Sequence, residues 1–72
     1  MNPWITADGW LRVTYDGPEL AVIEIELPGT GWLPAYLGYG DRGERVAQVR
    51  WDGPVPGVVN LRVNGVITGS YP

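Results

Sequence analysis

The chain has 72 residues, so it forms at most one domain with a small core. Hydrophobic residues make up 44% and charged residues 18%, which excludes both a disordered tail and a membrane segment. Eleven Gly and seven Pro oppose a helical bundle, because both residue types break helices. The absence of Cys and His removes disulfides, thiolate metal sites and the commonest general base.

The net charge is −3, and five scattered Arg face eight acidic residues with no Lys. A nucleic-acid-binding protein carries a basic patch, so we expect no nucleic-acid partner. No stretch approaches the roughly 20 consecutive apolar residues that span a bilayer. The beginning of the sequence lacks the basic and apolar regions of a signal peptide, so we expect synthesis in the cytoplasm and no membrane partner.

The first half of the sequence predicts two strands that end at Gly- or Pro-containing turns. Residues 1–9 are interpreted as an N-terminal arm, and residues 10–15 alternate hydrophobic and polar side chains as a strand does. Residues 20–27 give the clearest strand, in which β-branched and other aliphatic residues alternate with two glutamates. Each strand is followed by a segment rich in Gly and Pro.

The middle of the sequence is harder to assign. Residues 32–37 are ambiguous, because Pro34 favours an edge strand or an irregular segment. Residues 38–43 predict a loop. Residues 44–51 alternate again, and although a short helix is an alternative, the turn that follows Trp51 favours a strand.

The last part of the sequence predicts a hairpin. Residues 58–63 and 66–68 are joined by Asn64-Gly65, the strongest two-residue hairpin signal, and residues 69–72 form a C-terminal tail. We therefore predict one all-β domain over residues 10–68, a small antiparallel sandwich or barrel of five to six short strands. The predicted inward residues are Leu11, Val13, Ile23, Ile25, Leu27, Ala47, Val49, Trp51, Val59, Leu61 and Val63.

The sequence also contains a candidate internal duplication. Residues 13–18 (VTYDGP) resemble residues 49–54 (VRWDGP), an offset of 36 positions, and the match continues through the following strand and turn. A true duplication predicts two similar hairpins in which Tyr15 and Trp51 play equivalent roles before a turn. The alternative is that any hairpin with an Asp-Gly-Pro connection looks this way.

One segment matches a nucleotide-binding pattern by its letters alone. Residues 38–43 (GYGDRG) fit G-x-G-x-x-G, but the dinucleotide fingerprint requires a preceding strand, a following helix and a βαβ unit. Because a convincing helix and the βαβ unit are missing from the predicted elements, we interpret the segment as a flexible loop and expect no cofactor.

The acidic residues give no catalytic or metal site. Glu24 and Glu26 are expected on a solvated strand face, and Asp41 and Glu44 near one loop, without the cleft that glycoside hydrolysis needs. No ligand spacing typical of a calcium loop is present. The single serine, Ser70, has no His or Lys to activate it. We therefore predict that the chain is not an enzyme.

The aromatic residues are the most informative. Four Trp and four Tyr occur without any Phe, and Trp and Tyr are enriched at interface hot spots. Tyr15 and Trp51 fall on inward positions, whereas the other aromatic residues exceed what so small a core can cover. We predict that these form an interface with a protein or stack on sugar rings: Trp4, Trp10, Trp32, Tyr36, Tyr39 and Tyr71.

In overall character the chain resembles the small β virion proteins of tailed phages that infect high-GC actinobacteria. The resemblance rests on Arg without Lys, abundant Trp, Gly and Pro, small size, and turns such as WDGP (51–54) and VNGV (63–66). It covers the whole chain and assigns no functional residue. It implies a capsid decoration, minor capsid or minor tail protein, located in the virion, with a major capsid or tail protein or a second copy as partner.

Two other functions are kept as alternatives. A carbohydrate-binding module would use the same exposed Trp and Tyr side chains as stacking platforms. A small acidic inhibitor of a host enzyme would use the negative charge to mimic nucleic acid, although five Arg offset the eight acidic residues.

Overall fold

The computed structural model describes residues 3–71, and these form seven β-strands and no helix. The strands are β1 (Trp4–Ile5), β2 (Trp10–Thr14), β3 (Ile23–Leu27), β4 (Gly31–Tyr39), β5 (Arg45–Arg50), β6 (Val59–Val63) and β7 (Val66–Tyr71). The predicted all-β class with antiparallel pairing is confirmed, with seven strands in place of five to six. The segment 44–51, for which a helix was the alternative, is a strand.

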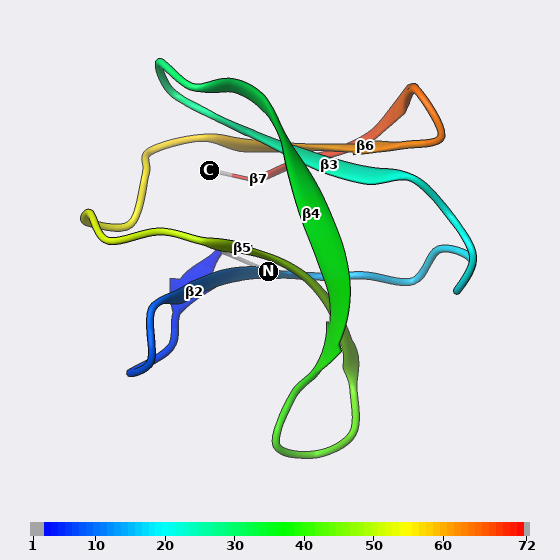
Figure 1. Cartoon of the computed structure of the whole chain (residues 1–72), viewed down its shortest axis with the longest axis horizontal. Coiled ribbons are helices and arrows are strands. Elements are labelled where there is room, and N and C mark those ends of the chain that lie inside the picture. Colours follow the sequence, from blue (N-terminus) through cyan, green and yellow to red (C-terminus); the bar gives the residue numbers. More distant parts are fainter. Residues whose placement is uncertain (1–2, 72) are drawn as a thin grey trace.

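The strands form one curled sheet, a half-barrel, in the order β1-β2-β5-β4-β3-β6-β7. In Figure 1, β3 and β6 lie above, β2 and β5 lie below, and the long β4 runs between the two groups. Residues 31–35 of β4 pair with β3, and residues 36–39 pair with β5. We call β1, β2, β5 and the second part of β4 the lower layer, and the first part of β4, β3, β6 and β7 the upper layer.

Pro34 fits this arrangement although β4 is central in the strand order. The sequence favoured an edge strand or an irregular segment here, and the structure instead has a nine-residue strand. However, residues 31–35 pair on one side only, with β3. Since Pro has no backbone N–H to donate, it is tolerated where one side of the strand has no partner.

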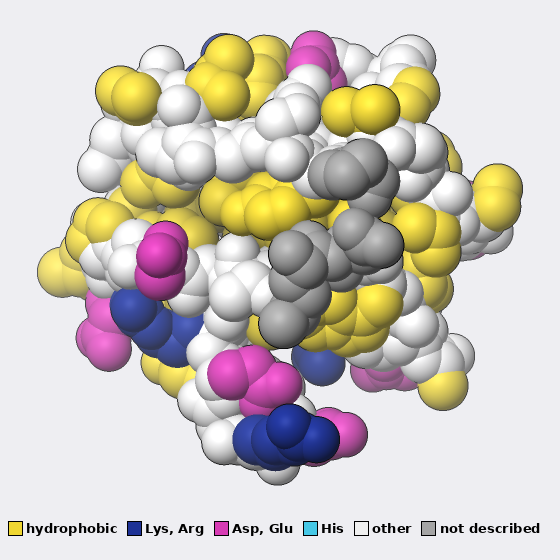
Figure 2. Space-filling model, turned by 180° about the vertical axis from the view of Figure 1, so that it is seen from behind, with side chains coloured by type: hydrophobic (Ala, Val, Ile, Leu, Met, Phe, Trp, Pro, Cys, Tyr) yellow, Lys and Arg dark blue, Asp and Glu magenta, His cyan; other side chains and the backbone are white. Residues whose placement is uncertain are grey.

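The core lies between the two layers, and it follows the predicted alternation. All the expected inward residues are buried except Trp51 and Val63, which are half-buried and pack against the core. Tyr15 is also buried, as expected, and so is Val46, which was not expected. Figure 2, seen from the side opposite β4, shows hydrophobic side chains across the middle of the molecule and charged side chains at its lower end.

Strand pairing extends into both predicted flanking segments. β1 lies within the expected arm and pairs with β2, with Trp4 opposite Arg12. β7 continues to Tyr71, within the expected tail. Residues 1, 2 and 72 of these two segments lie outside the described residues.

The two Asp-Gly-Pro turns have the same local structure. The Tyr15 hydroxyl donates a hydrogen bond to the Pro18 carbonyl oxygen at 2.6 Å, and the Trp51 indole N–H donates to the Pro54 carbonyl oxygen at 2.8 Å. Each ring also lies against the glycine of its turn, because a Cβ added there would come within 2.7 Å of the Tyr15 ring atoms or 3.1 Å of those of Trp51. We call each such contact an aromatic brace.

The pairing registers relate the two halves in the same way. Where β2 pairs with β5, Arg12 lies opposite Gln48, and where β3 pairs with β6, Ile25 lies opposite Leu61. Both pairs join residues that are 36 positions apart, which is the offset of the sequence match. Two halves related by a local twofold axis would have to show the same offset in both pairs of strands.

We expect Tyr15→Phe to lower the free energy of unfolding by about 0.5–1.5 kcal/mol, because it removes the hydrogen bond to Pro18 and keeps the buried ring. The control is Tyr39→Phe, at a residue that is 57% exposed, for which we expect a change within about 0.5 kcal/mol. Urea unfolding followed by Trp fluorescence measures both values. Equal effects of the two substitutions would show that the hydrogen bond from Tyr15 to Pro18 adds no stability.

Candidate functional site

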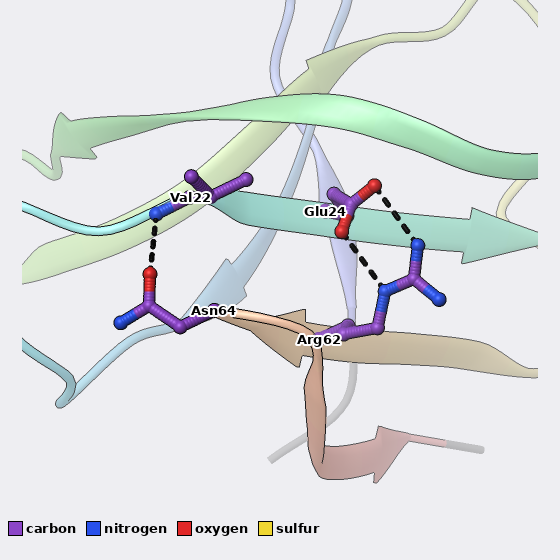
Figure 3. A network of polar contacts seen from close by, with 4 residues as sticks. All are labelled: Val22, Glu24, Arg62 and Asn64. Atoms are coloured by element: carbon purple, nitrogen blue, oxygen red, sulfur yellow. Dashed lines mark hydrogen bonds and ion pairs between the residues drawn. The ribbon is translucent and has the colours of Figure 1, made fainter.

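A bidentate ion pair lies on the outer side of the upper layer. Glu24 of β3 is opposite Arg62 of β6, and Arg62 Nε and Nη2 donate to the two carboxylate oxygens of Glu24, each at 2.9 Å (Figure 3). Their side chains are 24% and 27% exposed. The hydrogen bond from Arg62 holds the pKa of Glu24 below its ordinary value of 4.5. Two parallel bonds of this kind fix both the distance and the orientation of the two groups.

The same guanidinium covers an indole ring. Arg62 Cζ lies 4.3 Å from the ring centre of Trp32, which belongs to β4 on the other side of β3. Glu24 therefore holds one edge of the guanidinium while Trp32 packs against its face, in a cation–π arrangement. Beside them, the Asn60 side-chain amide donates to Glu26 at 3.0 Å.

Val22 and Asn64 are joined by two hydrogen bonds next to this pair. The Val22 N–H donates to the Asn64 side-chain oxygen at 2.9 Å, and the Asn64 N–H donates to the Val22 carbonyl at 2.8 Å. Figure 3 shows the first of these two hydrogen bonds beside the Glu24–Arg62 pair. They fix Val22, the residue just before β3, against the hairpin turn. In this turn Asn64 and Gly65 both have positive φ angles, as the Asn-Gly signal predicts.

Exposed large aliphatic side chains occur in β7 and in the segment that leads into β3. Leu20 is 95% exposed, and Val22 and Ile67 are each 64% exposed. Ile67 lies opposite Arg62 in the pairing of β6 with β7. We call this surface the β3–β6 face and define it by these residues: Leu20, Val22, Glu24, Trp32, Arg62 and Ile67.

The six residues predicted to form an interface do not lie together. Trp32 belongs to the β3–β6 face. Trp4, Trp10 and Tyr36 lie on the lower layer, where Trp4 is opposite Arg12 and Tyr36 is opposite Gln48. The Trp10 ring is half-buried and covered by Arg50, whose Cζ is 4.0 Å from the ring centre.

The remaining two tyrosines differ in their surroundings. Tyr39 is exposed at the end of β4. Tyr71 is half-buried and packs against the core. Burial raises the pKa of Tyr71, with a further contribution from the negative charge of Asp16.

Sequence reasoning missed the exposed aliphatic residues, although the signals were present. Because Ile23 and Ile25 face inward, alternation places Val22 on the outer side. A two-residue turn at Asn64-Gly65 places Ile67 opposite Arg62, which also faces outward. The predicted interface contained only aromatic residues and therefore left out these exposed aliphatic side chains.

Other candidate chemistry is not supported by the geometry. The G-x-G-x-x-G segment forms the end of β4 and a turn, and β5 follows it. Among residues 3–71, no group of three or more acidic side chains is placed to hold a metal ion. The part of the chain that the structure describes contains no helix able to cross a membrane.

Comparisons with known proteins identify no relative. No family model matches the chain, and neither a curated protein nor a solved structure matches it. The fold defines the chain as an antiparallel half-barrel.

The Glu24–Arg62 pair predicts a specific dependence of stability on pH. Since folding lowers the pKa of Glu24, the pair stabilises the fold above the ordinary glutamate pKa of 4.5, and this contribution is lost as pH falls through the lowered value. We expect wild type to be more stable than Glu24→Gln at neutral pH and the difference to shrink below pH 4.5.

Urea unfolding at a series of pH values measures this difference. Glu19→Gln serves as the control for the loss of one negative charge, because Glu19 is exposed in the connection between β2 and β3. A difference between wild type and Glu24→Gln that stays constant down to the acid limit of folding would contradict the prediction.

Proposed function

We propose that the chain is a non-enzymatic structural protein that docks on a larger protein assembly and stabilises it. The observation that carries this proposal is the β3–β6 face, which combines three exposed aliphatic side chains, from β7 and from the segment that leads into β3, with an ion pair that is already hydrogen-bonded. The resemblance to small phage virion proteins supports a capsid or tail as the assembly.

The aliphatic side chains supply the driving force for docking. Full burial of one Leu, Ile or Val side chain contributes about 1.5–3 kcal/mol. Leu20, Val22 and Ile67 are all well exposed, so most of their surface remains to be covered. A partner with a complementary apolar surface would bury them together.

The ion pair makes this surface easier to cover. Burying a single charge is costly, because the charge loses its water without gaining a partner. Glu24 and Arg62 already satisfy each other through two bonds, and Trp32 lies against the guanidinium. The partner therefore meets a neutral, rigid pair, and Arg and Trp are residue types enriched at interface hot spots.

Docking stabilises the assembly by mass action. Each copy binds the assembled state in preference to separate subunits, and a free concentration one hundred times the dissociation constant contributes about 2.7 kcal/mol per site. This mode of action needs no catalytic step.

We expect the double variant Leu20→Ser, Ile67→Thr to bind its assembly about tenfold more weakly or worse, because it removes the aliphatic surface of two of the three exposed side chains. Density-gradient sedimentation of particles from the cells that make the chain, with mass spectrometry of each fraction, measures the bound copies. Ile67→Thr keeps a β-branched residue in β7 and so preserves strand preference.

Val55→Ser is the matched control, because Val55 is 51% exposed in the loop between β5 and β6. It should sediment with the particles as wild type does. The proposal fails if wild-type chain remains entirely in the slow fractions, or if the double variant stays particle-bound to the same extent.

A further inference from the structure

A groove lies on the lower layer, away from the β3–β6 face. It has a volume of about 740 Å³ and runs between the turn that joins β1 to β2 and the loop that joins β4 to β5. Trp4 and Arg12 line it together with charged residues from these two connections, namely Asp8, Asp41, Arg42 and Glu44. Its size is within the usual range for small-molecule sites.

The centre of the groove is held in place by hydrogen bonds. Arg12 Nε donates to the Gln48 side-chain oxygen at 2.8 Å, which fixes the guanidinium on the sheet. Trp4 lies directly opposite Arg12 on the neighbouring strand, so the indole and the guanidinium are side by side on the same face. The hydrogen-bond donors of Arg12 and the aromatic surface of Trp4 therefore lie next to each other in the groove.

Carboxylates lie on either side of this centre. Asp8 accepts a hydrogen bond from the Thr6 hydroxyl, and this bond holds the pKa of Asp8 below its ordinary value. Glu44 accepts from the backbone N–H of Arg42 at 2.9 Å, and backbone hydrogen bonds lower its pKa as well. The charge of Arg12 contributes to both shifts. Both groups are thus ionised acceptors at neutral pH.

The composition of the groove excludes several classes of ligand. Three carboxylates outnumber two guanidinium groups, so a phosphate or another anion meets net repulsion. A cation is repelled by the positive charge of Arg12 at the centre of the groove. An apolar ligand would remove five charged groups from water without replacing their hydrogen bonds.

We infer that this groove binds a neutral carbohydrate. A sugar ring has one apolar face of C–H groups, which suits the Trp4 indole, and a rim of hydroxyls that both donate and accept hydrogen bonds. The guanidinium groups of Arg12 and Arg42 donate, while the carboxylates of Asp8, Asp41 and Glu44 accept. This is a second binding activity, separate from docking through the β3–β6 face.

The experiment is a screen of wild-type chain against an array of neutral oligosaccharides: α- and β-glucans, mannans, galactans and N-acetylglucosamine oligomers, with acidic glycans included. The tightest neutral binder is then titrated in solution by calorimetry and Trp fluorescence. We expect Trp4→Ala to weaken its binding about tenfold or more, and Asp41→Asn to weaken it measurably.

A second groove variant and a control variant complete the experiment. Asp41 lies in an exposed turn, so Asp41→Asn tests the groove even if Trp4→Ala fails to fold. Trp32→Ala, on the β3–β6 face, should bind the oligosaccharide as wild type does. The inference is overturned if no neutral oligosaccharide binds, if acidic glycans bind more tightly than all neutral ones, or if the Trp4 and Asp41 variants bind as wild type. None of these results bears on docking, which the Leu20/Ile67 double variant tests separately.

Discussion

The two aromatic braces are the contacts on which the rest of the fold depends. The chain crosses from the lower to the upper layer twice, from β2 to β3 and from β5 to β6, and an Asp-Gly-Pro turn begins each crossing. At both turns a ring covers the glycine and its N–H or O–H satisfies the proline carbonyl. The β2–β5 and β3–β6 ladders, on either side of these crossings, pair residues with the same offset of 36 positions.

The groove lies where the two halves differ. In the second half, Gln48 has Tyr36 of β4 as its neighbour on the side away from β2. The equivalent position beside Arg12 is held by Trp4 of β1. The Arg12–Gln48 pair thus has an aromatic residue on either side, but different connections flank the two ends. The short β1–β2 turn and the charged β4–β5 loop are what enclose Trp4 and Arg12.

Local sequence patterns predict most of the strands but fewer of the side-chain arrangements on the surface. Alternation identified the buried faces of β2, β3, β5 and β6, and Asn64-Gly65 fixed the start of β7. No local pattern shows that β4 pairs with β3 through one part and β5 through the other, because this depends on contacts distant in sequence. The strand order also places Arg50 over the Trp10 ring and Arg62 over the Trp32 ring. Local sequence patterns do not show strand order, so the prediction of exposed indoles did not include these arginines.

The proposed functions use surfaces that do not compete for space. The upper and lower layers turn their outer sides away from each other, with the core between them (Figure 1). A copy docked through the β3–β6 face would therefore leave the groove at Trp4 open to solvent. Many copies on one assembly would present many grooves, and multivalent binding gains strength far beyond that of one site. A weak affinity of each groove for a sugar is then sufficient, which agrees with a site that is open and built from few side chains.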